Sequence, residues 1–91
     1  MFLYSQNYTI YYYRDQDKNE VDFVIANRVG HIVGIEVKSA ASVSANDLKG
    51  LKKLAASAKK SFIAGVILYD GNETLPLGDR LWAIPISTLW K

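Results

Sequence analysis

Residues 20–38 read EVDFVIANRVGHIVGIEVK, two apolar segments carrying charges at alternate positions on either side of the tight turn at 28–30. Side chains two residues apart in a β-strand point to the same face of a sheet. If the two segments pair as an antiparallel hairpin, three carboxylates and one ammonium group come together on one patch. The side chains of this patch are Glu20, Asp22, Glu36 and Lys38.

A three-residue loop at 28–30 predicts the register of the hairpin, because Gly30 supplies the positive φ that a type I turn followed by a bulge requires. The predicted pairs are Asn27–His31, Ala26–Ile32, Val24–Gly34, Asp22–Glu36 and Glu20–Lys38. The other face is then entirely apolar, with Val21, Phe23, Ile25, Val33, Ile35 and Val37. A slip of one residue would mix the two sets, so the hydrophobic pattern favours this register and an apolar face turned toward the core.

The residue types on the charged face are suited to a divalent metal ion and a phosphate. Mg²⁺ is typically held by one or two carboxylates, here Asp22 and Glu36, with waters and phosphate oxygens as its other ligands. The ammonium of Lys38 is placed to stabilise negative charge that develops on a reacting phosphate. Carboxylates opposite each other on neighbouring strands repel, and a cation would relieve that repulsion. The alternative is the solvated face of an ordinary hairpin, with Glu20 and Lys38 as a cross-strand ion pair.

An acidic strand, a hairpin, a Glu-x-Lys segment and a following helix resemble the PD-(D/E)XK superfamily of restriction-endonuclease-like nucleases. More narrowly, the chain resembles the C-terminal domain of a large prokaryotic family of AAA+ ATPases. The resemblance is carried by residues 13–15, 20–23, 35–39, 65–69 and 83–86. It implies Asp22 and Glu36 as ligands of Mg²⁺ or Mn²⁺, Lys38 as the catalytic lysine and Glu20 as an accessory group. It also implies an ATPase domain as a partner.

The rest of the chain predicts an α/β fold. Residues 8–14 are rich in aromatic and β-branched types and indicate a first strand, and the apolar run 62–69 indicates a strand buried on both faces. Between them, Ser44 and Asp47 are typical of a helix start, and an apolar stripe predicts a helix over 45–58. Residues 80–86 predict an edge strand, since Pro85 cannot donate to a ladder. Three lysines flank the apolar stripe of the predicted helix 45–58: Lys49, Lys52 and Lys53. They indicate either a solvated face or a track for nucleic acid.

These elements predict a restriction-endonuclease-like mixed sheet of four to five strands in the order 1-2-3-4-5, with a crossover helix between the third and fourth strands. The 91 residues are expected to form a single domain over 1–91, a fragment or truncated copy that lacks the first helix of the superfamily. With 49% hydrophobic residues and 11 aromatic ones, such a small domain is expected to offer apolar surface to another domain or subunit, which allows a homo-oligomer.

Composition limits the cellular compartment and the classes of binding site that are expected. The chain has no cysteine, so disulfides and thiolate metal sites are excluded, and a reducing cytoplasm is expected. No segment approaches the roughly 18 apolar residues of a membrane span. A net charge of +2 allows DNA binding without requiring it. His31 lies at the tip of the predicted hairpin, where it is expected to be a surface residue.

Two functions follow from these observations and from the resemblance. One is metal-dependent cleavage of DNA phosphodiester bonds, carried by Asp22, Glu36, Lys38 and Glu20. The other is a catalytically inactive binding or regulatory module of an ATPase that has kept the nuclease fold. The intact acidic pair and lysine favour the enzyme, whereas the missing first helix and the weak charge favour the module.

Overall fold

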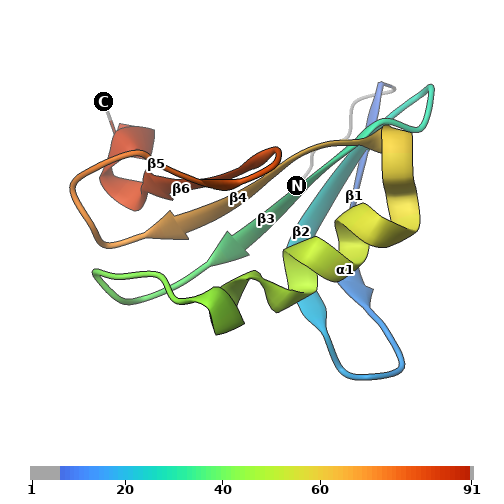
Figure 1. Ribbon diagram of the computed structural model, residues 1–91. Helices are drawn as coiled ribbons and strands as arrows, with labels where there is room; N and C mark the ends of the chain where they lie inside the picture. Colours follow the sequence, from blue (N-terminus) through green and yellow to red (C-terminus); the bar gives the residue numbers. More distant parts are fainter. Residues whose placement is uncertain (1–6, 91) are drawn as a thin grey trace.

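The computed structural model describes residues 7–90, which form a six-stranded sheet with a helix against one face (Figure 1). The strands are β1 (Tyr8–Arg14), β2 (Glu20–Asn27), β3 (Ile32–Val37), β4 (Phe62–Tyr69), β5 (Leu75–Gly78) and β6 (Leu81–Pro85). Helix α1 (Lys49–Ala58) follows a 3₁₀ turn at Ala45–Leu48, and further 3₁₀ turns occupy Lys59–Ser61 and Ile86–Trp90. No helix in this part of the chain combines the length and apolarity needed to cross a bilayer.

The strand order is β1-β2-β3-β4-β6-β5. Strands β1, β2 and β3 pair antiparallel, β3, β4 and β6 pair parallel, and β5 returns antiparallel to β6. The mixed α/β class and the crossover helix between β3 and β4 are therefore confirmed, but the predicted strand count and order are wrong. A sixth strand, β5, lies at the edge, and β6, predicted as the edge strand, lies inside the sheet.

The chemistry of proline explains that error. Pro76 lies in β5, which is an edge strand. An edge strand tolerates proline, because the missing N–H can face solvent and no second strand has to accept from it. The sequence predicts no strand over Leu75–Gly78, because proline and glycine are depleted in strands. Pro85 is the last residue of β6, so its missing N–H interrupts the ladder only at the strand end.

The predicted hairpin register is confirmed over its central pairs, Val24–Gly34 and Ala26–Ile32. Gly30 has φ 90° and its N–H donates to the carbonyl of Asn27, as the predicted turn requires. His31 is exposed beside it. The turn chemistry and the hydrophobic alternation were therefore sufficient to set this register.

The prediction of which face of the hairpin is buried was wrong. A β-bulge in β2 sets two residues, Asp22 and Phe23, opposite one residue of β1, so Val21 joins Val24 on the face that α1 covers. Both valines are fully buried, whereas Phe23 is 48% exposed and Val37 is 45% exposed on the opposite face. The apolar face predicted as core is thus the face without a helix.

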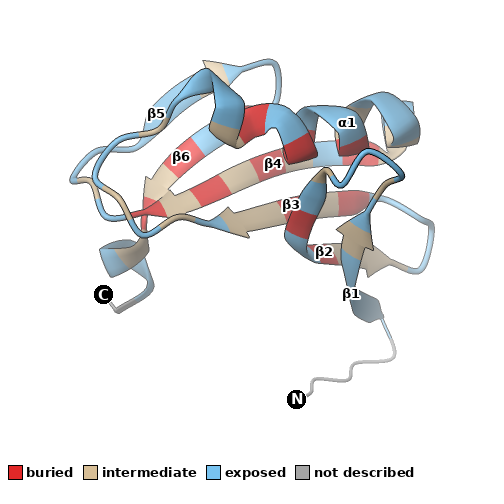
Figure 2. Ribbon diagram, turned by 90° about the horizontal axis from the view of Figure 1, so that it is seen from below, coloured by how far each residue is buried: buried red, intermediate tan, exposed pale blue. Residues whose placement is uncertain are grey.

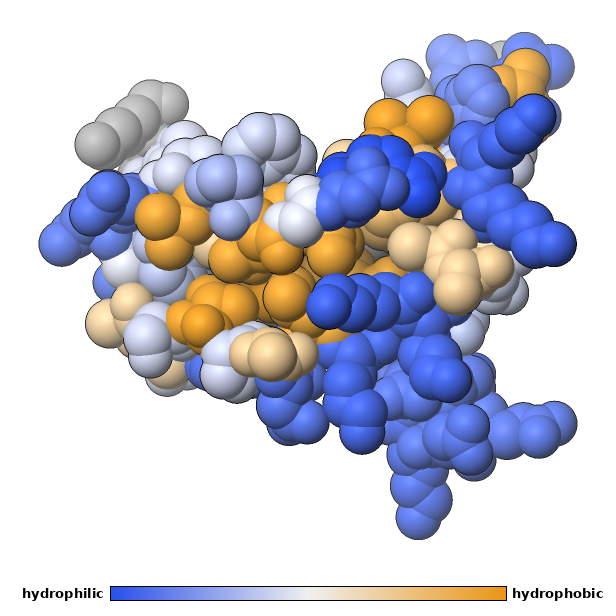
Figure 3. All heavy atoms as spheres, viewed as in Figure 1, coloured by the Kyte–Doolittle hydropathy of each residue, from blue (hydrophilic) through white to orange (hydrophobic). Residues whose placement is uncertain are grey.

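Helix α1 approaches the sheet closely over Gly34 and Gly65. A Cβ atom would lie 2.8 Å from Leu51 Cδ2 at Gly34 and 3.2 Å from it at Gly65, so the absence of a side chain lets the helix sit there. Leu51 is fully buried and Leu54 is 4% exposed. Red and tan segments alternate along β4 in Figure 2, because alternate residues face the helix. Figure 3 shows apolar residues gathered over β3 and β4, with hydrophilic residues around the loop between β1 and β2.

The start of the helical segment was predicted at the correct residue but with a different conformation. The predicted helix 45–58 divides into the 3₁₀ turn Ala45–Leu48 and α1. At its start the backbone N–H of Ser44 donates to the Asp47 carboxylate at 2.7 Å, which confirms the cap. This cap fixes Asp47 beside the carboxyl end of β3.

Candidate active site

The carboxylates of Asp22 and Glu36 each accept a hydrogen bond from the backbone of the neighbouring strand, β3 or β2. The backbone N–H of Asp22 donates to Glu36 Oε1 at 2.7 Å, and the backbone N–H of Val37 donates to Asp22 Oδ2 at 2.9 Å. Each carboxylate thus binds the backbone next to the other acid. The structure brings together the two acids that the sequence placed opposite each other.

The bulge in β2 accounts for this arrangement. The regular β2–β3 pairing ends at Phe23–Ile35, and the next residues toward the strand ends are Asp22 and Glu36. Backbone N–H groups beyond the last ladder pair need other acceptors. The two carboxylates supply these acceptors, so part of their role is to close the end of the sheet.

Glu36 is the less exposed of the two acids, since Asp22 is exposed and Glu36 is half-buried. Burial raises the pKa of the Glu36 carboxyl, the hydrogen bond from the Asp22 N–H lowers it, and the negative charges of Asp22, Glu20 and Asp47 raise it further. The net pKa shift is upward. A nearby cation would reverse this effect, because positive charge favours the ionised carboxylate.

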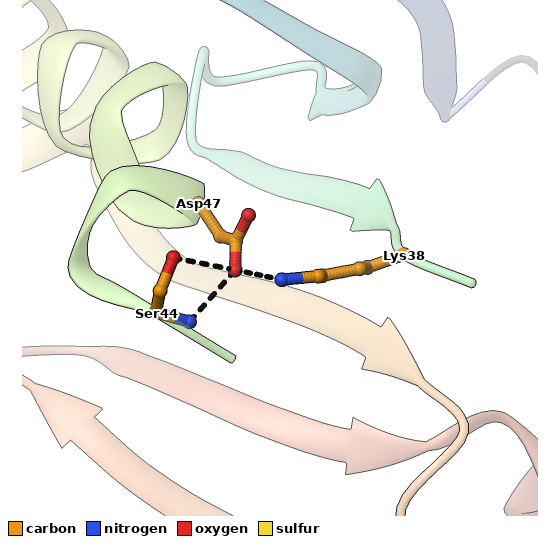
Figure 4. A network of polar contacts seen from close by, with 3 residues as sticks. All are labelled: Lys38, Ser44 and Asp47. Carbon is orange, nitrogen blue, oxygen red and sulfur yellow. Dashed lines mark hydrogen bonds and ion pairs between the residues drawn. The ribbon is translucent and has the colours of Figure 1, made fainter. Parts of the chain in front are cut away.

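Lys38 contacts Asp47 at the start of the helical segment (Figure 4). The Asp47 Oδ2 atom accepts hydrogen bonds from Lys38 Nζ, from the Ser44 N–H and, at 3.0 Å, from Ser44 Oγ. The hydrogen bond from Lys38 is the main cause of a lowered pKa at Asp47. The cross-strand ion pair of Lys38 with Glu20, which belonged to the alternative interpretation of this face, is not among the ion pairs of residues 7–90.

Glu20 accepts a hydrogen bond from the Tyr12 hydroxyl and lies opposite Arg14 in the β1–β2 ladder. That hydrogen bond is the main cause of a raised pKa at Tyr12. Glu20 and Glu36 also line one open pocket of about 330 Å³. The lining residues are Asp17, Lys18, Asn19, Glu20, Glu36, Asn46, Asp47, Lys49 and Gly50.

The pocket joins the predicted residues to two that sequence reasoning did not assign to the site. The sequence predicts Asp47 only as a helix cap, although its position at the end of the crossover from β3 could indicate that it lies near Lys38. It predicts Lys49 on the flank of the helix, as part of a solvated face or of a track for nucleic acid. Asp22 and Lys38 do not line this pocket. Asp22 is connected to the pocket residue Glu36 by the hydrogen bond from its backbone N–H, and its carboxylate binds the Val37 N–H. Lys38 is connected to the pocket by its ion pair with Asp47.

Asp22 and Glu36 carry carboxylate oxygens, the donor type that Mg²⁺ and Mn²⁺ use in proteins. Within residues 7–90, no group of three or more His, Cys, Asp or Glu side chains is arranged to hold a metal ion. The described hydrogen bonds involve one oxygen of Asp22 and one of Glu36, and Mg²⁺ commonly uses only one or two carboxylates together with water. These two residues therefore have the donor set for a largely hydrated Mg²⁺ or Mn²⁺ ion.

Comparison with known proteins gives one family. No curated protein and no solved structure matches the chain. The family described as "Domain of unknown function (DUF4143)" matches residues 2–89, which is nearly the whole chain. The chain therefore belongs to the DUF4143 family.

Proposed function

We propose that this domain binds Mg²⁺ or Mn²⁺ through Asp22 and Glu36 and cleaves phosphodiester bonds in DNA. The observation that carries the proposal is the pair of hydrogen bonds that fixes each carboxylate to a backbone N–H of the neighbouring strand, at the end of β2 and β3. Lys38 follows Glu36 at the next alternate position, which agrees with the Glu-x-Lys pattern of the PD-(D/E)XK nucleases that the sequence resembles. The fold class is compatible with that superfamily.

A divalent ion in such a site polarises the phosphoryl oxygen and lowers the pKa of a bound water. The chain contributes position and charge. Glu36 is held by the Asp22 N–H, so its carboxylate does not need to reorganise when a ligand arrives. Lys38 has three N–H donors and the described contact with Asp47 uses one, which leaves donors for a phosphate oxygen.

Asp47 acts in this proposal as a positioning residue for Lys38. It ties the ammonium to the start of the helical segment, and the two side chains are only 28% and 24% exposed. A fixed ammonium stabilises developing negative charge at lower cost in reorganisation than a mobile one. Glu20, on the rim of the pocket with Lys49, has an accessory role at the approach to the site.

The resemblance to the C-terminal domain of AAA+ ATPases also supports a proposed partner. In that arrangement an ATPase domain, attached to this chain or separate from it, delivers or remodels the DNA in the cytoplasm.

The test measures metal binding and cleavage separately. Calorimetric titration with Mn²⁺ should show binding for the wild type and a loss of binding for Asp22→Asn and Glu36→Gln. Glu73→Gln, which removes an exposed carboxylate in the loop after β4, is the matched control and should bind as the wild type does. Equal binding by all variants would contradict the assignment of the ligands.

Cleavage is measured on single-stranded, duplex and branched DNA with Mg²⁺ or Mn²⁺. Lys38→Ala should retain metal binding and lose cleavage, because the ammonium acts on the phosphate. A wild type that binds metal but cleaves none of these substrates, alone or with an ATPase partner, would contradict the nuclease proposal.

The second candidate is a non-catalytic module that docks onto an ATPase. It is favoured by the absence, within residues 7–90, of a metal cluster of three acidic or histidine side chains. Wild-type protein that shows neither metal binding nor cleavage would support this function.

A further inference from the structure

The sheet face opposite α1 carries three rows of laterally paired residues without a charged side chain. Strand pairing places side chains of one row next to each other on the same face. The first row is Ile10, Ile25, Val33 and Ala64. The second is Phe23, Ile35, Val66, Trp82 and Pro76, and the third is Val37, Leu68 and Ile84. We call these rows the open face.

The open face is an apolar surface with several exposed large side chains. Ile10, Phe23, Val37 and Trp82 are 42% to 48% exposed. A fully exposed aromatic side chain presents about 200 Å², and with the partly exposed members the rows leave roughly 600 Å² of apolar area. The largest apolar patch on a monomeric protein is typically about 300–600 Å² and is often functional, so the open face lies at the upper end of that range.

Sheet architecture gives an independent reason to expect a cover. Strands β3, β4 and β6 form a parallel core. Parallel strands occur almost only in sheets with both faces covered, because their connections place helices there. In residues 7–90, α1 covers one face and the rows of the open face remain solvent-accessible (Figures 1 and 2).

We propose that the open face binds the same face of a second copy of this chain, giving a symmetric dimer. Its area of roughly 600 Å² approaches the about 800 Å² per partner of a standard stable interface. The absence of charge in its rows makes the face compatible with itself, since a two-fold axis brings identical surfaces together. The two sheets would pack about 10 Å apart and nearly aligned, as in a β-sandwich.

This inference does not depend on the proposed nuclease activity, since the acids and Lys38 are not members of the rows. The charged pair Arg14 and Glu20 lies at the margin of the β1–β2 end, where it would form part of a polar rim. Interfaces commonly combine an apolar centre with a polar rim.

Sedimentation velocity and light scattering of the full chain at micromolar to submillimolar concentrations test the dimer. The wild type should show a concentration-dependent mass of two copies, and Trp82→Glu should shift the equilibrium toward the monomer by at least tenfold in Kd. Val29→Glu is the matched control, because Val29 is 75% exposed at the turn between β2 and β3, outside the rows, and this variant should dimerise as the wild type does.

Circular dichroism and a cooperative thermal transition show whether each variant is folded. If Trp82→Glu does not fold, Phe23→Gln, which replaces a 48% exposed side chain, is measured in the same way. A wild type that stays monomeric over the whole range, or a dimer that both folded variants leave unchanged, would overturn the proposal. The monomeric result would instead favour a helix of another polypeptide as the cover.

Discussion

Gly50 lies where α1 crosses the beginning of β2, and it is the tightest contact between the helix and the candidate site. A Cβ atom there would lie 2.0 Å from the carbonyl oxygen of Glu20 and 2.9 Å from its carbonyl carbon. These are backbone atoms, so no side-chain rotation can make room. Gly50→Ala therefore forces α1 and β2 apart.

The size of the effect follows from that distance. A normal carbon–oxygen contact is about 3.3 Å, so the two backbones must separate by about 1.3 Å. A gap of 0.5–1 Å already loses about a quarter to a half of the attraction between packed atoms, and Leu51, which is fully buried, is next to the contact. Overpacking costs about 1–3 kcal/mol, and a backbone displacement of about 1.3 Å corresponds to the upper part of that range, about 2–3 kcal/mol. The better helix propensity of alanine returns about 1 kcal/mol.

We expect Gly50→Ala to lower the free energy of unfolding by about 1–2 kcal/mol, or the melting temperature by roughly 5–15 °C for a domain of this size. Urea denaturation followed by circular dichroism measures it. Ser57→Ala, at an exposed position of the same helix, is the control and should be neutral or stabilising by up to about 0.5 kcal/mol. A Gly50→Ala protein as stable as the wild type would refute the reasoning.

Three further predictions concern the charges of the site. Burial raises the pKa of Glu36 in the folded state, so ionisation of this carboxyl opposes folding at pH 7. Glu36→Gln should therefore raise the melting temperature at pH 7. The gain should disappear below about pH 4, where the carboxyl is protonated in both the folded and the unfolded protein. Lys38 lowers the pKa of Asp47, so Asp47→Asn should destabilise the fold at neutral pH. The ionised Asp47 carboxylate stabilises the folded state fully only above its unfolded pKa, so the stability difference between wild type and Asp47→Asn should shrink as the pH falls through the lower, folded pKa. Thermal melts from pH 7 to pH 2 measure both variants. A stability difference from the wild type that stays constant over this range would contradict the pKa shift assigned to Glu36 or to Asp47. Lys49 lines the acidic pocket whereas Lys52 lies on the exposed side of α1, so Lys49→Gln should reduce the slope of log K for DNA against log salt by about one and Lys52→Gln should not; equal slopes in an anisotropy titration would contradict the distinction.

Local patterns in the sequence were sufficient for the elements with strong periodicity. The first strand over 8–14 and the apolar strand over 62–69 have the predicted bounds, because their aromatic, β-branched and apolar runs have few alternatives. The prediction that the strand over 62–69 is buried on both faces was wrong, since the residues of β4 that alternate with the buried ones are half-buried or exposed. The helix start at Ser44 and the hairpin register near Gly30 follow from hydrogen bonds within a few residues. The register also predicts that Asp22 and Glu36 lie near each other, but the regular pairing ends at Phe23–Ile35 and their observed contacts lie beyond it.

Tertiary structure decided what depends on distant partners. The sequence shows an apolar and a charged face on the hairpin, but the position of the crossover helix and the bulge in β2 decide that Val21 and Val24 are buried together. Lys38 binds Asp47 instead of Glu20 because the helical segment begins beside the end of β3. Strand β5 forms only because β6 offers it an edge, since Leu75–Gly78 has little strand propensity of its own. Local hydrogen bonding thus set the turns, the helix start and the hairpin register, whereas the buried face, the partner of Lys38 and the sixth strand were set by packing between segments far apart in the chain.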